Sequence, residues 1–156
     1  MAEEAHERIQ VTAPPDVCFG IATDFERYPE WANNVRQVKV LTRDEQGRGS
    51  TVEFRVAGLG RSVRQVFAYD YVDAPAALSW HLVEGEMLRR LDGRYGFQPS
   101  DRADAAEPNC RREATVVTYD LALEFGLPLP GLVKRQVTGL IMGNALKALK
   151  QEAERR

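Results

Sequence analysis

Four tyrosines and one tryptophan are the side chains in this sequence best placed to do chemistry. Tyr69, Tyr71, Tyr95, Tyr119 and Trp80 lie in strand-like runs, in phase with apolar residues. Alternation along a strand therefore puts them on the apolar face of a sheet. A buried hydroxyl or indole N–H needs a partner, so these groups either bond one another in a filled core or orient the carbonyl or phenol of a ligand. A tyrosine with an ordinary pKa of ~10 is only a weak general acid.

Other kinds of reactive site find little support. His6 and His81 are the only histidines, and neither has a second ligand at a useful spacing, so no metal site is expected. Cys18 is predicted to be a small core residue, and Cys110 an inert surface thiol rather than a nucleophile; no disulfide between them is expected. The segments "GRGS" and "GLGRS" lack the strand–loop–helix context of a nucleotide site, so no cofactor is expected.

Length and composition indicate one globular domain over residues 1–156. Apolar residues make up 44% and charged residues 28%, with a net charge of -2, so no nucleic-acid partner is expected. No apolar run reaches the ~18 residues of a transmembrane segment, and the acidic "MAEEAHER" is no signal peptide. Two cysteines suit a reducing compartment, so the predicted location is the cytoplasm.

The last part of the chain predicts one long helix at about residues 131–154, which follows the breaker run "GLPLPG". At ~1.5 Å per residue it would span ~35 Å and needs a broad surface to lie on. One stripe at helical spacing consists of Val133, Val137, Leu140, Ile141 and Asn144. A second stripe, rotated from the first, consists of Ile141, Met142, Ala145, Leu146 and Leu149.

The remainder alternates between apolar and charged residues, which is typical of strands with one wet face. Hairpin-length connections predict an antiparallel sheet of seven strands. The expected elements are a strand at 5–12, a helix at 15–23, a second short helix capped by Asp24, strands within 34–98, a polar hairpin tip at 99–110 and a strand at 112–125.

An aromatic wedge follows the first helix. Phe25, Tyr28 and Trp31 recur every three residues. The wedge either plugs one end of the core or lines the mouth of a pocket.

One helix of ~10 Å diameter cannot cover seven strands spaced ~4.8 Å apart. The uncovered inner face predicts an apolar cavity, which is the default binding site for a hydrophobic small molecule. The predicted lining is Phe54, Phe67, Tyr69, Trp80, Tyr95, Tyr119, Val137, Ile141 and Asn144, with Trp31 near one mouth.

Several motifs resemble the START-like (SRPBCC) superfamily: "DFERYPEW" after the β–α start, "LSWHL", "LDGRYGFQP", and "TVVTYDLALEF" before the terminal helix. The nearest branches are the polyketide cyclase/dehydrase group and the coenzyme Q-binding START-like proteins. The resemblance implies an α+β helix-grip (START/Bet v 1-like) fold, in which the sheet wraps around the terminal helix.

Three functions follow from the resemblance. The first is binding or carriage of a quinone, polyketide or lipid by a monomer or homodimer. The second is a polyketide aromatase/cyclase or dehydrase, for which the resemblance implies an arginine beside tyrosines or tryptophans; no arginine can be placed inward here. The third is a protein-interaction module with a filled core. Fold alone does not choose among them.

Overall fold

The structure is a computed structural model of the 156-residue chain. It describes residues 3–32, 34–58, 61–103, 111–126 and 128–155. The elements, in chain order, are β1 (Glu3–Val11), α1 (Pro15–Thr23), the 3-10 turn η1 (Phe25–Arg27), α2 (Tyr28–Trp31), β2 (Val35–Arg43), β3 (Gly49–Gly58), β4 (Arg61–Asp70), β5 (Ala77–Gly85), β6 (Leu88–Ala103), β7 (Arg111–Phe125) and α3 (Gly131–Arg155).

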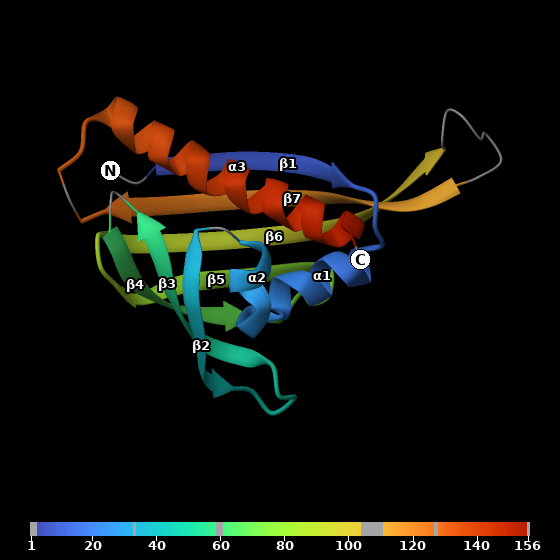
Figure 1. Cartoon of the computed structure of the whole chain (residues 1–156), viewed down its shortest axis with the longest axis horizontal. Coiled ribbons are helices and arrows are strands. Elements are labelled where there is room, and N and C mark those ends of the chain that lie inside the picture. The colour runs from blue at the N-terminus through green and yellow to red at the C-terminus, as the bar shows by residue number, and fades with distance from the viewer. Residues whose placement is uncertain (1–2, 33, 59–60, 104–110, 127, 156) are drawn as a thin grey trace.

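The strands form one antiparallel sheet in the order β1-β7-β6-β5-β4-β3-β2. The expected seven-stranded sheet, long C-terminal helix and two short helices after the first strand are confirmed (Figure 1). Strand β1 leaves the hairpin order and pairs with β7, with Ile9 opposite Val117. The first strand therefore lies beside the last strand and next to α3, the helix that follows the last strand.

Helix α1 forms where local signals and burial agree. Pro15 occupies its first turn, where a missing N–H costs nothing. Cys18, Ile21 and Ala22 share one face and are buried. The expected cap by Asp24 is wrong, because its side chain makes no capping hydrogen bond; its backbone N–H instead donates to Ile21 O, at 3.3 Å.

Helix α3 lies over one side of the sheet (Figure 1). It packs mainly against β1, with smaller contacts to α1 and β7. Among the described residues, no helix combines the length and hydrophobicity that a membrane span requires. The inner faces of β3, β4 and β5 are thus left to side chains rather than to the long helix.

The β6–β7 hairpin extends further than expected. Strand β6 continues to Ala103, so the part of the predicted hairpin tip at 99–103 is strand. Pro99 pairs with Thr115 in the register. Backbone pairing with β7 overrides the polar composition there. Residues 104–110, including Cys110, lie outside the described residues.

Candidate functional site

A layer of aromatic rings covers the inner face of the sheet, with Trp80 at its centre. Its ring centroid lies 4.9 Å from that of Tyr95 and 5.8 Å from those of Tyr69 and Tyr119. The register explains the cluster, because Tyr69 pairs with Trp80 and Tyr95 pairs with Tyr119. Directly opposed residues on one face have neighbouring side chains. The structure therefore brings four of the predicted site residues together.

The ring layer continues toward β3. Phe54 and Phe67 lie 5.7 Å apart between centroids, and both are buried. From η1, Phe25 packs 6.3 Å from Phe54 and 4.5 Å from Tyr69. Phe25 is only 2% exposed, so this member of the predicted wedge is part of the core. Phe25 thus covers the part of the inner sheet face, at β3 and β4, that α3 does not reach.

Trp31 has a different environment. It is half-buried on α2, and its ring lies 4.7 Å from that of Tyr28. The Tyr28 hydroxyl donates to Ala22 O at 2.5 Å. By contrast, Trp31 Nε1 is fully buried and has no hydrogen-bond acceptor. The wedge thus presents one unsatisfied donor beside the aromatic layer.

The helix residues divide into two groups. Val137 and Ile141 are half-buried. Asn144 is exposed, and Leu140 is 63% exposed, so their placement in the buried stripe is wrong. The helix packs instead through Thr138, Met142, Leu146, Leu149 and Ala153. Both misplaced residues lie two positions from Met142, or about 200° around the helix, and therefore face away from the sheet.

Three tyrosine hydroxyls on the inner face have no partner among the described residues. No described residue bonds to the hydroxyl of Tyr69, Tyr95 or Tyr119, and the expected alternative of mutual bonding is not observed. None of these oxygens is among the fully buried atoms that lack a partner; within the described chain, Trp31 Nε1 alone has that status. Each hydroxyl therefore borders space that a water molecule can reach. Tyr71, in contrast, donates to Gly49 O at 2.6 Å.

Burial changes the acidity of these groups. Desolvation raises the pKa of Tyr69 and of Tyr95 well above the usual range, and that of Tyr119 in the same direction. The neutral form is favoured because an apolar environment penalises the phenolate. The three hydroxyls are thus neutral hydrogen-bond donors at physiological pH, and they are weaker acids than tyrosine in water.

Comparison with known proteins agrees with this geometry. A family model described as "Polyketide cyclase / dehydrase and lipid transport" matches residues 11–150. The chain belongs to this family. No curated protein matches the sequence.

Solved structures place this START-like family member among proteins of the same fold. A START superfamily protein from Mycobacterium smegmatis is 25% identical over 97% of both chains, with a TM-score of 0.85. Zhui aromatase/cyclase from a Streptomyces species is 16% identical over 100% of this chain and 96% of its own, with a TM-score of 0.78. A protein from Thermus thermophilus is 21% identical over 97% of both, with a TM-score of 0.74. The likeness to the last two shows the fold alone.

The inner face of this polyketide cyclase/dehydrase family member carries little charge. In the described part of the chain, the buried polar or charged side chains are Gln65, Thr115, Thr138 and Glu152. Both threonines donate to backbone oxygens, those of Ala13 and Lys134, at 2.7 Å. No buried lysine or arginine is therefore present there to polarise a ligand carbonyl.

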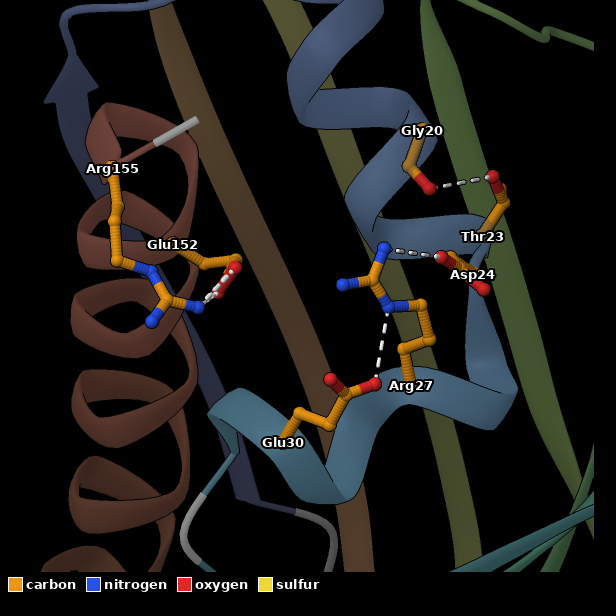
Figure 2. Close-up of polar contacts among 7 residues, drawn as sticks. All are labelled: Gly20, Thr23, Asp24, Arg27, Glu30, Glu152 and Arg155. Atoms are coloured by element: carbon orange, nitrogen blue, oxygen red, sulfur yellow. Dashed lines mark hydrogen bonds and ion pairs between the residues drawn. The ribbon is translucent and has the colours of Figure 1, made fainter.

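Glu152 belongs to a polar cluster at one end of the molecule, shown in Figure 2. It accepts hydrogen bonds from Arg155 on the same helix, at 2.6 and 2.5 Å. Across from it, Arg27 donates to Glu30 at 3.0 Å. Because α1 also packs against α3, β6 and β7, this end of the inner face is covered by helices.

Gln65 is the inner-face residue that sequence reasoning missed. It lies on β4 between Val63 and Phe67, which are both buried, and it is only 8% exposed. Strand phase alone would have found it, since inward positions recur every second residue.

The surface depressions lie mostly outside the aromatic layer. One of about 440 Å³ on the outer sheet face is lined by both histidines, and Trp80 also borders it. Another, of about 520 Å³, includes Tyr69 and Tyr71. His81 is exposed, and His6 pairs with Asp120 at 2.7 Å. The described residues contain no cluster of metal-binding side chains.

Proposed function

We propose that this protein binds an uncharged hydrophobic small molecule between the inner sheet face and α3. One observation carries the proposal: the hydroxyls of Tyr69, Tyr95 and Tyr119 have no partner among the described residues and yet border accessible space. Buried polar groups in folded proteins are nearly always satisfied, so these donors call for water or for a ligand. The aromatic rings around them supply the apolar surface that a hydrophobic molecule needs.

The ligand class follows from the donors. A neutral hydroxyl recognises an acceptor such as a carbonyl, quinone or phenol oxygen. No buried cation accompanies the three tyrosines in the described chain. A ligand carboxylate bound there would therefore lose its hydration without gaining a charged partner. Membership of a family described by lipid transport as well as by cyclisation supports carriage of such a compound.

A second candidate is an aromatase/cyclase or dehydrase acting on a polyketide. The family description and the fold shared with an aromatase/cyclase favour it. The raised pKa values weigh against it, because a tyrosine with a higher pKa is a poorer general acid near neutrality. Hydrogen bonding could still hold and polarise a substrate, so turnover has to be measured.

Native mass spectrometry of the purified protein, followed by organic extraction, tests the proposal directly. A bound neutral compound rich in carbonyl or hydroxyl groups is the expected result. An added polyketide that is recovered unchanged supports carriage, whereas a dehydrated or cyclised product supports the enzyme.

Fluorescence gives a second test that needs no native ligand. The chain has two tryptophans, so Trp31→Phe leaves Trp80 as the only indole. Saturable quenching of Trp80 by a quinone is expected, and Trp80→Ala should weaken binding while the fold survives. Failure of quinones, fatty acids and aromatic polyketides to quench, with severe destabilisation by Trp80→Ala, would favour the interaction module with a filled core.

A further inference from the structure

We infer that Gln65 contacts a polar group at the outer end of the ligand and thereby determines which ligands bind. The inference rests on the proposed function. Gln65 lies on the inner face of β4, paired with Phe54 on β3 and with Gly85 on β5. Only 8% of the residue is exposed, which makes it the one buried amide side chain among the described residues.

The carboxamide of Gln65 has no partner in the described part of the chain. No hydrogen bond from the described residues reaches it, and its atoms are not among those sealed from solvent. The group therefore keeps some accessible surface, like the three tyrosine hydroxyls. A carboxamide both donates and accepts, so it can recognise a ligand hydroxyl or a ligand carbonyl.

The neighbouring glycine leaves room for this amide. A Cβ at Gly85 would lie 3.0 Å from Leu82 Cδ1 and 3.4 Å from Gln65 Cγ. The first of these contacts is tighter than most Cβ contacts and the second is close to an ordinary van der Waals contact, so a larger residue at position 85 would press mainly on Leu82. Glycine at position 85 thus places no side chain against Gln65 Cγ.

Gln65 lies at the less covered end of the inner face. Several apolar side chains near this end are only half-buried: Val56, Leu82, Leu88, Phe125, Val137 and Ile141. At the opposite end α1 packs on the sheet, with Phe19 edge-on to Phe97 at 5.9 Å. Tyr69 lies four positions after Gln65, or roughly 13 Å along the strand. An elongated neutral ligand can therefore contact tyrosine hydroxyls with its deep oxygen and Gln65 with its outer oxygen.

Two related probes distinguish the contact with the outer oxygen of the ligand from the contact with its deep oxygen. Equilibrium dialysis would compare 2,6-dihydroxyanthraquinone with 2-hydroxyanthraquinone, in mildly acidic buffer that keeps the phenols protonated. The wild-type protein should bind the dihydroxy compound about five-fold more tightly, the usual effect of one neutral hydrogen bond. Gln65→Leu should abolish this preference and leave the affinity for the monohydroxy compound unchanged. Gln98→Leu, on an exposed position of β6, is the control and should keep the preference.

Thermal melting without ligand provides the second measurement. Gln65→Leu should melt no lower than the wild type, since it breaks no hydrogen bond within the described protein. A wild type without preference, or a preference that survives Gln65→Leu, would refute the role of Gln65 while leaving ligand binding intact. If Gln65→Leu melted at a lower temperature and lost affinity for both probes equally, Gln65 would have a structural role. That result would also overturn the inference. If the wild type binds neither probe, the proposed function fails, and this inference fails with it.

Discussion

The indole of Trp80 lies directly over Gly93 on the neighbouring strand. A Cβ at position 93 would come within 2.3 Å of Trp80 Cε2 and 2.6 Å of Nε1. The two residues are register partners across β5 and β6. Glycine at this position therefore decides where the central ring of the aromatic layer can lie.

Gly93→Ala should disrupt that layer. The indole is packed against three tyrosine rings, so it cannot yield without moving them. Overpacking of this kind should lower the free energy of unfolding by about 1–3 kcal/mol, as measured by urea denaturation. Gly139→Ala on α3 is the control, because a Cβ there meets no atom within 4 Å. The control should gain about 0.5–1 kcal/mol from helix propensity. Equal stability of Gly93→Ala and wild type would contradict the observed packing.

The tyrosines should ionise only at a pH above the usual pKa of tyrosine. The chain has five, and burial raises the pKa of every one, that of Tyr71 to about 12. The native state therefore holds these protons more tightly than the unfolded state, whose tyrosines titrate near ~10. Their contribution to stability is complete below pH ~10 and is lost as the pH rises above it.

Absorbance at the phenolate band, followed together with circular dichroism, checks this expectation. Native protein should show no tyrosine titration near pH ~10, and ionisation should accompany alkaline unfolding. Protein unfolded in guanidinium is the reference and should titrate at the ordinary pKa. A phenolate step at that ordinary pKa with intact secondary structure would show that at least one ring is not buried as described.

Cys18 should be unreactive in the folded protein. It has no exposed surface, and burial is the main cause that raises the pKa of its thiol. Both effects slow attack on a disulfide reagent, since the thiolate is the nucleophile. In a Cys110→Ser variant, Ellman's reagent should detect no thiol until denaturant is added, and then one. In wild-type protein, an intact mass that changes on reduction would disprove the prediction that Cys18 and Cys110 are not bonded.

The ion pair between Arg155 and Glu152 should stabilise the end of α3. The Glu152 side chain is only 3% exposed, so its charge depends on nearby donors. Arg155→Gln should lower the denaturation midpoint more than Arg90→Gln, which removes the exposed pair with Asp92. If the two variants melt alike, the buried carboxylate does not rely on Arg155.

Much of the fold could be predicted from the sequence because the relevant signals are local. Alternation assigned Trp80, Tyr95 and Tyr119 to the apolar face, and the structure confirms this, since a strand has only two faces. The breaker run before Gly131 predicted the start of the long helix, which ends one residue beyond its expected end. Family membership could also be predicted, because the motifs that suggested it extend along most of the chain.

The tertiary structure alone decided how the long helix is oriented about its own axis. Its apolar residues cover a wide arc, so several rotations satisfy the helical pattern equally well. Packing mainly on β1 selected the face of Met142 and turned Asn144 toward solvent. The same placement leaves much of the inner sheet face to aromatic rings, among which three tyrosine hydroxyls and the Gln65 amide have no protein partner in the described chain. Periodicity can place a side chain on a face, but only the three-dimensional packing determines whether a polar group on that face finds a partner.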